Sequence, residues 1–137
     1  MTGRMRVMAL DWGKRRIGIA VSDGLGIAAH GLRTLARTTN RQDLDALIGL
    51  IRERDIETVI VGNPLHLDGT KSGSSSRAAR FAFQLARHAG VPVEMWDERL
   101  TSWEAESMLG TSPKDPGEID RLAAVLLLES YLAARQS

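Results

Sequence analysis

The hydrophobic residues of this chain change their spacing about a third of the way along it. Before that point they form short runs. Segments 6–12 (RVMALDW) and 16–23 (RIGIAVSD) are apolar, and a tight turn, GKR, separates them. Such runs predict two buried strands, and segment 27–35 (IAAHGLRTL) predicts a third. Three successive strands at the start of the chain indicate a meander.

Beyond residue 40, helical and strand patterns alternate. Apolar residues at i, i+3, i+4 and i+7 predict an amphipathic helix; they are Leu44, Leu47, Ile48 and Ile51. The β-branched run 57–62 (ETVIVG) predicts a strand, and so does segment 91–97 (VPVEMWD). Between them, segment 76–90 predicts a helix that ends at a glycine. Its expected buried residues are Ala78, Phe81, Ala82 and Leu85.

The last third of the chain predicts two more helices. Thr101 and Glu104 have the T-x-x-E spacing of a capping box, which predicts a helix over 101–109. Segment 118–135 (EIDRLAAVLLLESYLAAR) predicts a largely buried helix. The alternation of strands and helices predicts an α/β fold, with a mixed sheet covered on both faces and parallel among its later strands.

Length and composition narrow the possible classes. The 137 residues, 43% of them hydrophobic, fit one domain spanning 1–137. No apolar run approaches the ~20 residues that cross a bilayer, and no signal-peptide pattern is present, so we expect a cytoplasmic protein. Without cysteine, a metal must be held by oxygen ligands or by the three histidines. A net charge of +1 requires any nucleic-acid surface to be a local patch.

Carboxylates stand where two predicted strands end. Asp11 closes the first apolar run, and Asp97 and Glu98 follow the run VPVEMW. Ligands of open α/β sheets bind beyond the carboxyl ends of the strands. A buried carboxylate needs a counter-charge, hydrogen bonds or a metal. With Asp120 as a third member, these residues predict a site for a hard cation such as magnesium and for phosphodiester hydrolysis.

Two other interpretations of these carboxylates remain open. Asp120, placed in the first turn of its predicted helix, is also typical of a residue that compensates the helix dipole. Ion pairs with Arg15, Arg16 or Arg99 would satisfy the carboxylates without a metal.

The cations of the helix over 76–90 also admit two interpretations. Arg77, Arg80, Gln84 and Arg87 recur at helical spacing opposite its apolar face. They fit either a surface that follows a phosphate backbone or a solvated helix face. The long loop 63–76 (NPLHLDGTKSGSSS) follows a strand directly and is either functional or an insertion. Its histidine, His66, receives no role.

Four segments, in this order along the chain, resemble the YqgF family, also described as RuvX-like, of the ribonuclease-H-like superfamily. They are LDWGKRRIGIAVSD, VIVGNPLHLDGT, DERLTSWEA and IDRLAAVLLLESYL. The resemblance implies a ribonuclease-H-like, five-stranded mixed sheet with helices on both faces, the first three strands antiparallel and the last two parallel to the first. It also implies that Asp11, Glu98 and Asp120 are catalytic and hold Mg²⁺ or Mn²⁺, with Asp97 as an accessory candidate.

The function implied by the resemblance is a metal-dependent nuclease that matures the 5′ end of precursor 16S rRNA, with ribosomal particles among its partners. The alternatives are a Holliday junction resolvase acting on branched DNA and a non-catalytic RNA-binding module of ribosome assembly. The expected nucleic-acid contacts are Lys14, Arg15, Arg16, Arg77, Arg80 and Arg99. Lys14 departs from the family pattern, in which a small or polar residue is more frequent, and adds charge near the carboxylates.

The segment DWGKRRIGIA also resembles the phosphate-binding hairpin of sugar kinases, actin and heat-shock ATPases. Those proteins close two lobes around ATP, and 137 residues do not supply both. Nucleotide-dependent stabilisation would support this alternative.

Overall fold

The computed structural model of the chain describes residues 6–63, 73–97 and 116–136. The strands are β1 (Val7–Trp12), β2 (Arg16–Ser22), β3 (Ala29–Ala36), β4 (Thr58–Asn63) and β5 (Val93–Asp97). The helices are α1 (Asn40–Glu53), α2 (Gly73–Ala89) and α4 (Pro116–Gln136). The predicted helix over 101–109, with its capping box, lies outside the described residues.

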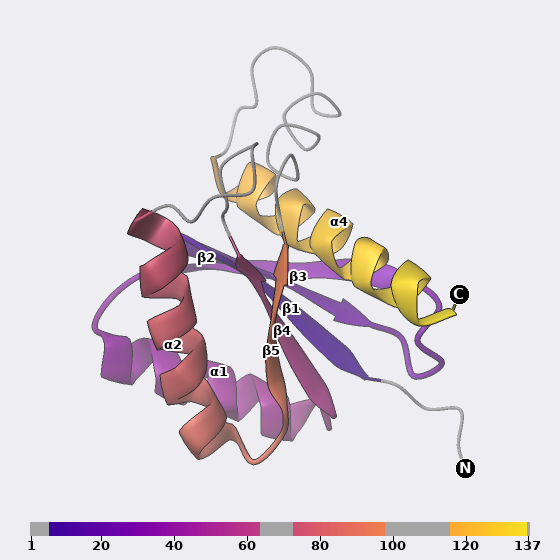
Figure 1. Cartoon of the computed structure of the whole chain (residues 1–137), viewed down its shortest axis with the longest axis horizontal. Coiled ribbons are helices and arrows are strands. Elements are labelled where there is room, and N and C mark those ends of the chain that lie inside the picture. The colour runs from indigo at the N-terminus through magenta and orange to yellow at the C-terminus, as the bar shows by residue number, and fades with distance from the viewer. Residues whose placement is uncertain (1–5, 64–72, 98–115, 137) are drawn as a thin grey trace.

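The strands form one five-stranded sheet in the order β3-β2-β1-β4-β5. β2 is antiparallel to β1 and β3, whereas β4 is parallel to β1 and to β5. Helix α4 crosses one face of this sheet, and α1 and α2 cover the other (Figure 1). The α/β class, the meander and the mixed sheet with helices on both faces are therefore confirmed.

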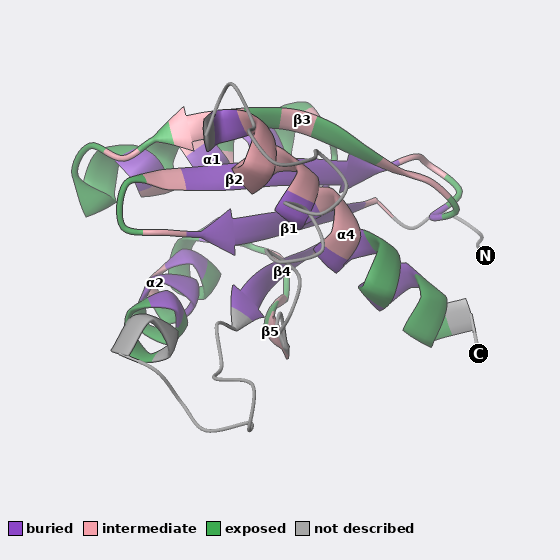
Figure 2. Cartoon of the chain, turned by 90° about the horizontal axis from the view of Figure 1, so that it is seen from above, coloured by how far each residue is buried: buried purple, intermediate pink, exposed green. Residues whose placement is uncertain are grey.

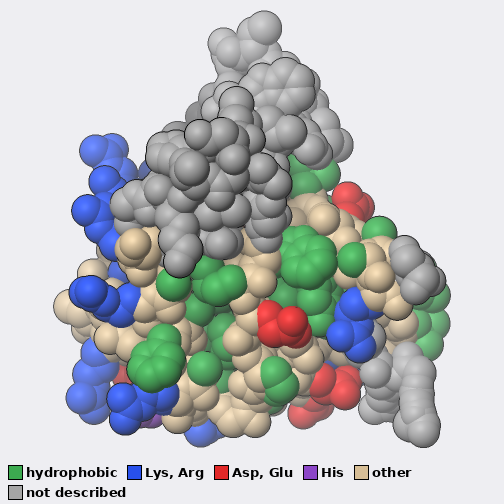
Figure 3. Space-filling model, in the orientation of Figure 1, with side chains coloured by type: hydrophobic (Ala, Val, Ile, Leu, Met, Phe, Trp, Pro, Cys, Tyr) green, Lys and Arg blue, Asp and Glu red, His purple; other side chains and the backbone are tan. Residues whose placement is uncertain are grey.

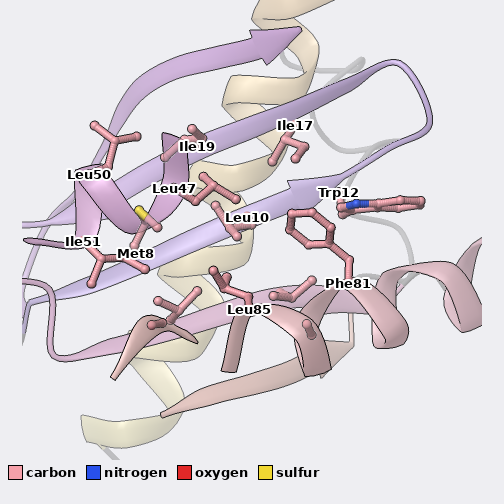
Figure 4. Packing of buried hydrophobic residues seen from close by; sticks show 14 of the residues in the cluster. Met8, Leu10, Trp12, Ile17, Ile19, Leu47, Leu50, Ile51, Phe81 and Leu85 are labelled. Carbon is pink, nitrogen blue, oxygen red and sulfur yellow. The ribbon is translucent and has the colours of Figure 1, made fainter. Parts of the chain in front are cut away.

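The central strand β1 is buried on both of its faces, which explains why its sequence is a continuous apolar run rather than an alternation. Its even-numbered residues Met8, Leu10 and Trp12 pack among the side chains of α1 and α2 (Figure 4). Val7 and Ala9 pack against α4 on the opposite face. β2 is buried almost throughout, whereas β3, at the edge, is mostly exposed or intermediate (Figure 2).

The predicted apolar stripes of α1 and α2 face the core. In α1, Leu47 and Ile51 are buried, and Leu44 and Ile48 pack against the same cluster. The predicted residues of α2 are all buried: Ala78, Phe81, Ala82 and Leu85. Thr39 caps α1, because its hydroxyl accepts the amide of Gln42 at 3.1 Å.

Helix α4 covers the other face with a continuous apolar surface. Its residues Ala124, Leu127, Leu128 and Tyr131 pack against β1, β2 and β4. Burial raises the pKa of the Tyr131 phenol, whose oxygen lies 3.2 Å from Glu94 Oε2. In the described part of the chain, no helix is long and apolar enough to span a membrane.

Gly18 sets how closely α4 approaches the sheet. A Cβ at this position would collide with the backbone carbonyl of Asp120. Gly31 of β3 lies against the next residue of α4, since a Cβ there would lie 2.7 Å from Cγ of the Arg121 side chain. The two glycines allow the first half of α4 to lie directly on β2 and β3.

We predict that Gly18→Ala lowers the free energy of unfolding by about 1–3 kcal/mol or more, because the added methyl group must displace helix backbone rather than a flexible side chain. Chemical denaturation measures the loss. The matched control is Gly49→Ala in α1, where a Cβ meets nothing within 4 Å. This control should gain about 0.5–1 kcal/mol. Equal effects of the two substitutions would contradict the close packing at Gly18.

Candidate active site

The predicted site lies where the parallel strands of the sheet end. Parallel strands end at the same edge, so the carboxyl ends of β1, β4 and β5 lie together, and β2 begins there with Arg16. Asp11 is the penultimate residue of β1. Asp97 ends β5, and its backbone pairs with Asn63 of β4. With β4 between them, β1 and β5 are about 10 Å apart.

Asp11 is a buried carboxylate on the face that α4 covers. It is 8% exposed. Because side chains alternate along a strand, Asp11 shares the face of Val7 and Ala9. Its cross-strand partner on that face is Gly18. Asp11 is therefore opposite a residue of β2 that has no side chain.

The packing at Gly18 brings Asp120 to Asp11. The backbone carbonyl of Asp120 lies directly over Gly18, and Gly18 is opposite Asp11 in the β1–β2 pair. Directly opposed residues of an antiparallel pair have Cα atoms about 4.5–5.5 Å apart. Two of the three predicted catalytic carboxylates, 109 positions apart in the sequence, thus lie at the same edge and on the same face of the sheet.

Asp120 forms an ion pair with Arg16. The guanidinium Nε donates to Oδ2 at 2.6 Å, and the two side chains are 38% and 23% exposed. This is one of the pairings that the sequence left open as an alternative to a metal. The pair offsets part of the negative charge of the Asp120 carboxylate.

The prediction that Asp120 lies in the first helical turn is wrong. Helix α4 begins at Pro116, two residues before the predicted start, because proline is well suited to the first helical position. The acidic residue of the first turn is Glu118. The helix dipole acts mainly within the first turn, so it stabilises the negative charge of Asp120 only weakly. Arg16 is its observed partner instead.

The described part of the site provides two hard oxygen donors. Asp11 and Asp120 are carboxylates, the ligand type that Mg²⁺ and Mn²⁺ prefer. Within the described residues, no three His, Asp or Glu side chains form a cluster suited to a metal. Glu98, the third predicted ligand, lies outside those residues, so its convergence with the other two stays a prediction. The donor chemistry of Asp11 and Asp120 fits a divalent cation.

The predicted nucleic-acid contacts fall in two places. Lys14 and Arg15 are exposed in the turn between β1 and β2, next to the site. Arg77 and Arg80 are exposed on α2, which packs on the opposite face of the sheet. Gln84, by contrast, does not belong to a solvated face, because its Oε1 is buried and has no hydrogen-bond partner within the described residues. Arg99 and His66 lie outside the described residues.

Sequence reasoning missed Arg37, which fixes the β1–β2 turn. Its Nη1 donates to the carbonyl of Gly13 at 2.9 Å, and its Nε donates to Oδ2 of Asp43 at 2.7 Å. Its guanidinium carbon also lies 4.8 Å from the ring centroid of Trp12. No periodicity marks this arginine. The sequence does contain a signal for Gly18, because an isolated glycine within a strand pattern indicates that another backbone approaches closely.

Comparisons with known proteins agree on one family. The family model described as "RuvX: Holliday junction resolvase" matches residues 5–134. A protein of Koribacter versatilis is 49% identical over 95% of this chain and 88% of its own length. A protein of Syntrophus aciditrophicus is 44% identical over 95% of this chain and 89% of its own. Both carry the name "Putative pre-16S rRNA nuclease".

Solved structures share the fold at low sequence identity. "T. thermophilus RuvC in complex with Holliday junction substrate" aligns with a TM-score of 0.63 and 16% identity, covering 96% of each chain. A fowlpox virus resolvase, solved with Holliday junction DNA, aligns with a TM-score of 0.55 and 12% identity over 97% of this chain and all of its own. The ribonuclease-H-like fold implied by the sequence is confirmed.

The two arginine–aspartate pairs should differ in strength according to burial. We predict that Arg16→Gln changes the free energy of unfolding by less than about 1 kcal/mol, because solvent screens this partly exposed pair. Arg37→Gln should cost about 3–5 kcal/mol, because it removes the charged partner of Asp43, which is 1% exposed. Urea denaturation of both variants measures the difference. A large loss in Arg16→Gln would mean that the pair with Asp120 is primarily structural.

Proposed function

This chain belongs to the RuvX family, and from that premise we propose that it is a metal-dependent nuclease that hydrolyses phosphodiester bonds at the 5′ end of precursor 16S rRNA. The observation that carries the proposal is the approach of Asp120 to Asp11 at Gly18. The names of the relatives from Koribacter versatilis and Syntrophus aciditrophicus support the choice of substrate.

Asp11, Asp120 and Glu98 would hold Mg²⁺ or Mn²⁺. Such a cation, when bound, activates a water nucleophile and stabilises the leaving oxygen in phosphodiester hydrolysis. Asp11 contributes a carboxylate on the rigid central strand, whose buried faces restrict its movement. Arg16 holds the carboxylate of Asp120 in place through its Nε–H. Asp97, which ends β5, remains an accessory candidate.

The exposed cations beside the carboxylates would orient the substrate. Lys14 and Arg15 project from the β1–β2 turn at the edge where Asp11 lies. With Arg16 and Arg99, they would contact phosphates next to the scissile bond. We further propose that the protein acts in the cytoplasm and that precursor ribosomal particles are its partners.

Branched DNA is the alternative substrate. The description of the matching family model and the fold shared with RuvC favour it. Hydrolysis of RNA and of DNA needs the same carboxylates, so Asp11 and Asp120 do not distinguish the two substrates. A second alternative, a non-catalytic RNA-binding module of ribosome assembly, would bind RNA without the carboxylates and would not cleave it.

We predict that cleavage of precursor 16S rRNA requires a divalent cation and is lost in Asp11→Asn and Asp120→Asn. Each change removes an anionic ligand at nearly constant volume, so cleavage should fall at least ~100-fold, a loss like that from removing one catalytic electrostatic group. The same loss is expected for Glu98→Gln. The assay incubates the purified protein with precursor rRNA, and separately with a four-way DNA junction, in magnesium, manganese or chelator.

The matched control is Glu129→Gln, which removes an exposed carboxylate from the same helix as Asp120. It should leave cleavage unchanged. Undiminished turnover by Asp11→Asn, with contaminating nuclease excluded, would falsify the assigned site. Cleavage of the junction alone would move the substrate to branched DNA, and RNA binding without any cleavage would indicate the assembly module.

Thermal melts test the same site without a substrate. Without metal, neighbouring carboxylates repel one another and are partly desolvated, so Asp11→Asn should melt at or above the wild-type temperature in chelator. Magnesium or manganese should raise the wild-type midpoint more than that of the variant, because a ligand stabilises only the form that binds it. A strongly destabilised variant whose metal response equals that of the wild type would contradict a metal site at Asp11.

A further inference from the structure

A basic cavity opens on the opposite side of the β1 end from Asp11. Its volume is about 460 Å³, and its walls come from the β1–β2 turn, the start of α1 and the first turns of α2. Four cations line it: Lys14, Arg37, Arg77 and Arg80. The remaining described lining residues are Trp12, Phe81 and Asn40, so no described acidic side chain lines the cavity.

Only one of these cations has its charge compensated by a described carboxylate. Arg37 is paired with Asp43 and spans the rings of Trp12 and Phe81, at 4.8 and 5.6 Å. It therefore belongs to the wall. Lys14 and the two arginines of α2 are exposed and form no ion pair with any carboxylate in the described part of the chain. No described carboxylate compensates their charges.

The wall also contains a buried hydrogen-bond donor that has no partner among the described residues. Trp12 is 8% exposed, and within the described residues its indole Nε1–H has no acceptor. A buried donor of this kind is uncommon in a folded protein and calls for an explanation. Trp12 and Phe81 lie side by side at one end of the core cluster (Figure 4). The first turn of α2 contains no acidic residue that would compensate the positive end of its dipole.

We propose that this cavity binds a phosphate group of the nucleic-acid strand, away from the bond that is cleaved. This inference rests on the proposed function and names a second contact of the same substrate. Asp11 and Trp12 are consecutive in β1, so their side chains point to opposite faces of the sheet. A strand that passes over the carboxyl end of β1 would place one phosphate near Asp11 and another in the cavity.

A nucleic-acid backbone fits the surroundings better than an isolated phosphate ion does. A neighbouring groove of about 740 Å³ shares Asn40 with the cavity and continues between α1 and α2. Its described lining includes three arginines and one carboxylate, namely Arg41, Arg52, Arg87 and Asp45. On the face shown in Figure 3, Lys and Arg side chains gather along the side where α1 and α2 lie. The positive surface is therefore extended.

The test follows the indole N–H signals by NMR of the ¹⁵N-labelled full chain, in chelator so that RNA is bound without being cut. The chain has three tryptophans, and Trp12→Phe identifies the signal of Trp12. A short single-stranded RNA should shift this signal. Trp12→Phe keeps the aromatic ring but removes the donor, so RNA affinity should fall about fivefold with no change in its salt dependence.

Charge variants distinguish RNA binding in this cavity from general electrostatic attraction between RNA and the protein surface. Arg77→Gln/Arg80→Gln should weaken RNA binding at least ~10-fold and make the slope of log K against log salt shallower by about 0.7 per lost phosphate contact. The control, Arg33→Gln/Arg135→Gln, removes two exposed charges that line neither the cavity nor the neighbouring groove. Its affinity should fall less than about threefold.

Equal losses in the two double variants, with no RNA-induced shift of the Trp12 signal, would overturn the proposal. A shift with inorganic phosphate and none with RNA would assign the cavity to a free phosphate and would overturn it as well. Since binding is measured without metal, the result is separate from catalysis. If cleavage depends on Asp11 but RNA does not bind in the cavity, the proposed function stands and this proposal fails. If RNA binds in the cavity but is not cleaved, only the proposed function fails.

Discussion

The contact between α4 and β2 at Gly18 is the constraint on which the rest of this structure depends. Only a residue without a side chain allows the helix backbone to lie directly on the strand, and the carbonyl at the point of contact belongs to Asp120. The β1–β2 register places Asp11 opposite the same glycine. One close-packed contact therefore sets both how α4 covers the sheet and which two acidic residues share this end and this face of the sheet.

The alternation of side chains along β1 divides the functional surface into two parts. Asp11 faces α4 and its carboxylate partner, while Trp12 faces the opposite layer, where Arg37 stacks on its ring. The β1–β2 turn connects the two parts. Arg37 fixes this turn by donating a hydrogen bond to the carbonyl of Gly13. A single strand end thus positions the candidate metal ligands on one face and a cationic cavity on the other. Both are built on rigid, buried backbone, which suits groups that must hold a flexible nucleic acid in one position.

Much of the fold could be predicted from the sequence because its strands and helices have distinct hydrophobic periods. The position of Asp11 was predictable too, since a carboxylate at the end of an apolar run points to a site at a strand end. The proximity of Asp120 was implied only by the family resemblance, because it depends on a contact between residues far apart in sequence that no spacing encodes. The N-terminus of α4 was misplaced by two residues, since the apolar pattern does not extend to Pro116. The partners of Arg16 and Arg37 depend on tertiary geometry that no spacing encodes.

Whether Asp11 and Asp120 hold one divalent cation can be tested most directly by paramagnetic broadening with Mn²⁺. At substoichiometric Mn²⁺, the backbone amide signals of Asp11, Gly18 and Asp120 should broaden first, while that of Gly49 in α1 stays sharp. The broadening should disappear in Asp11→Asn, because the variant lacks one of the two charged ligands. If the earliest broadening instead centres on α1, for example at the exposed Asp45, and the Gly18 signal stays sharp, then the contact at Gly18 does not build a metal site.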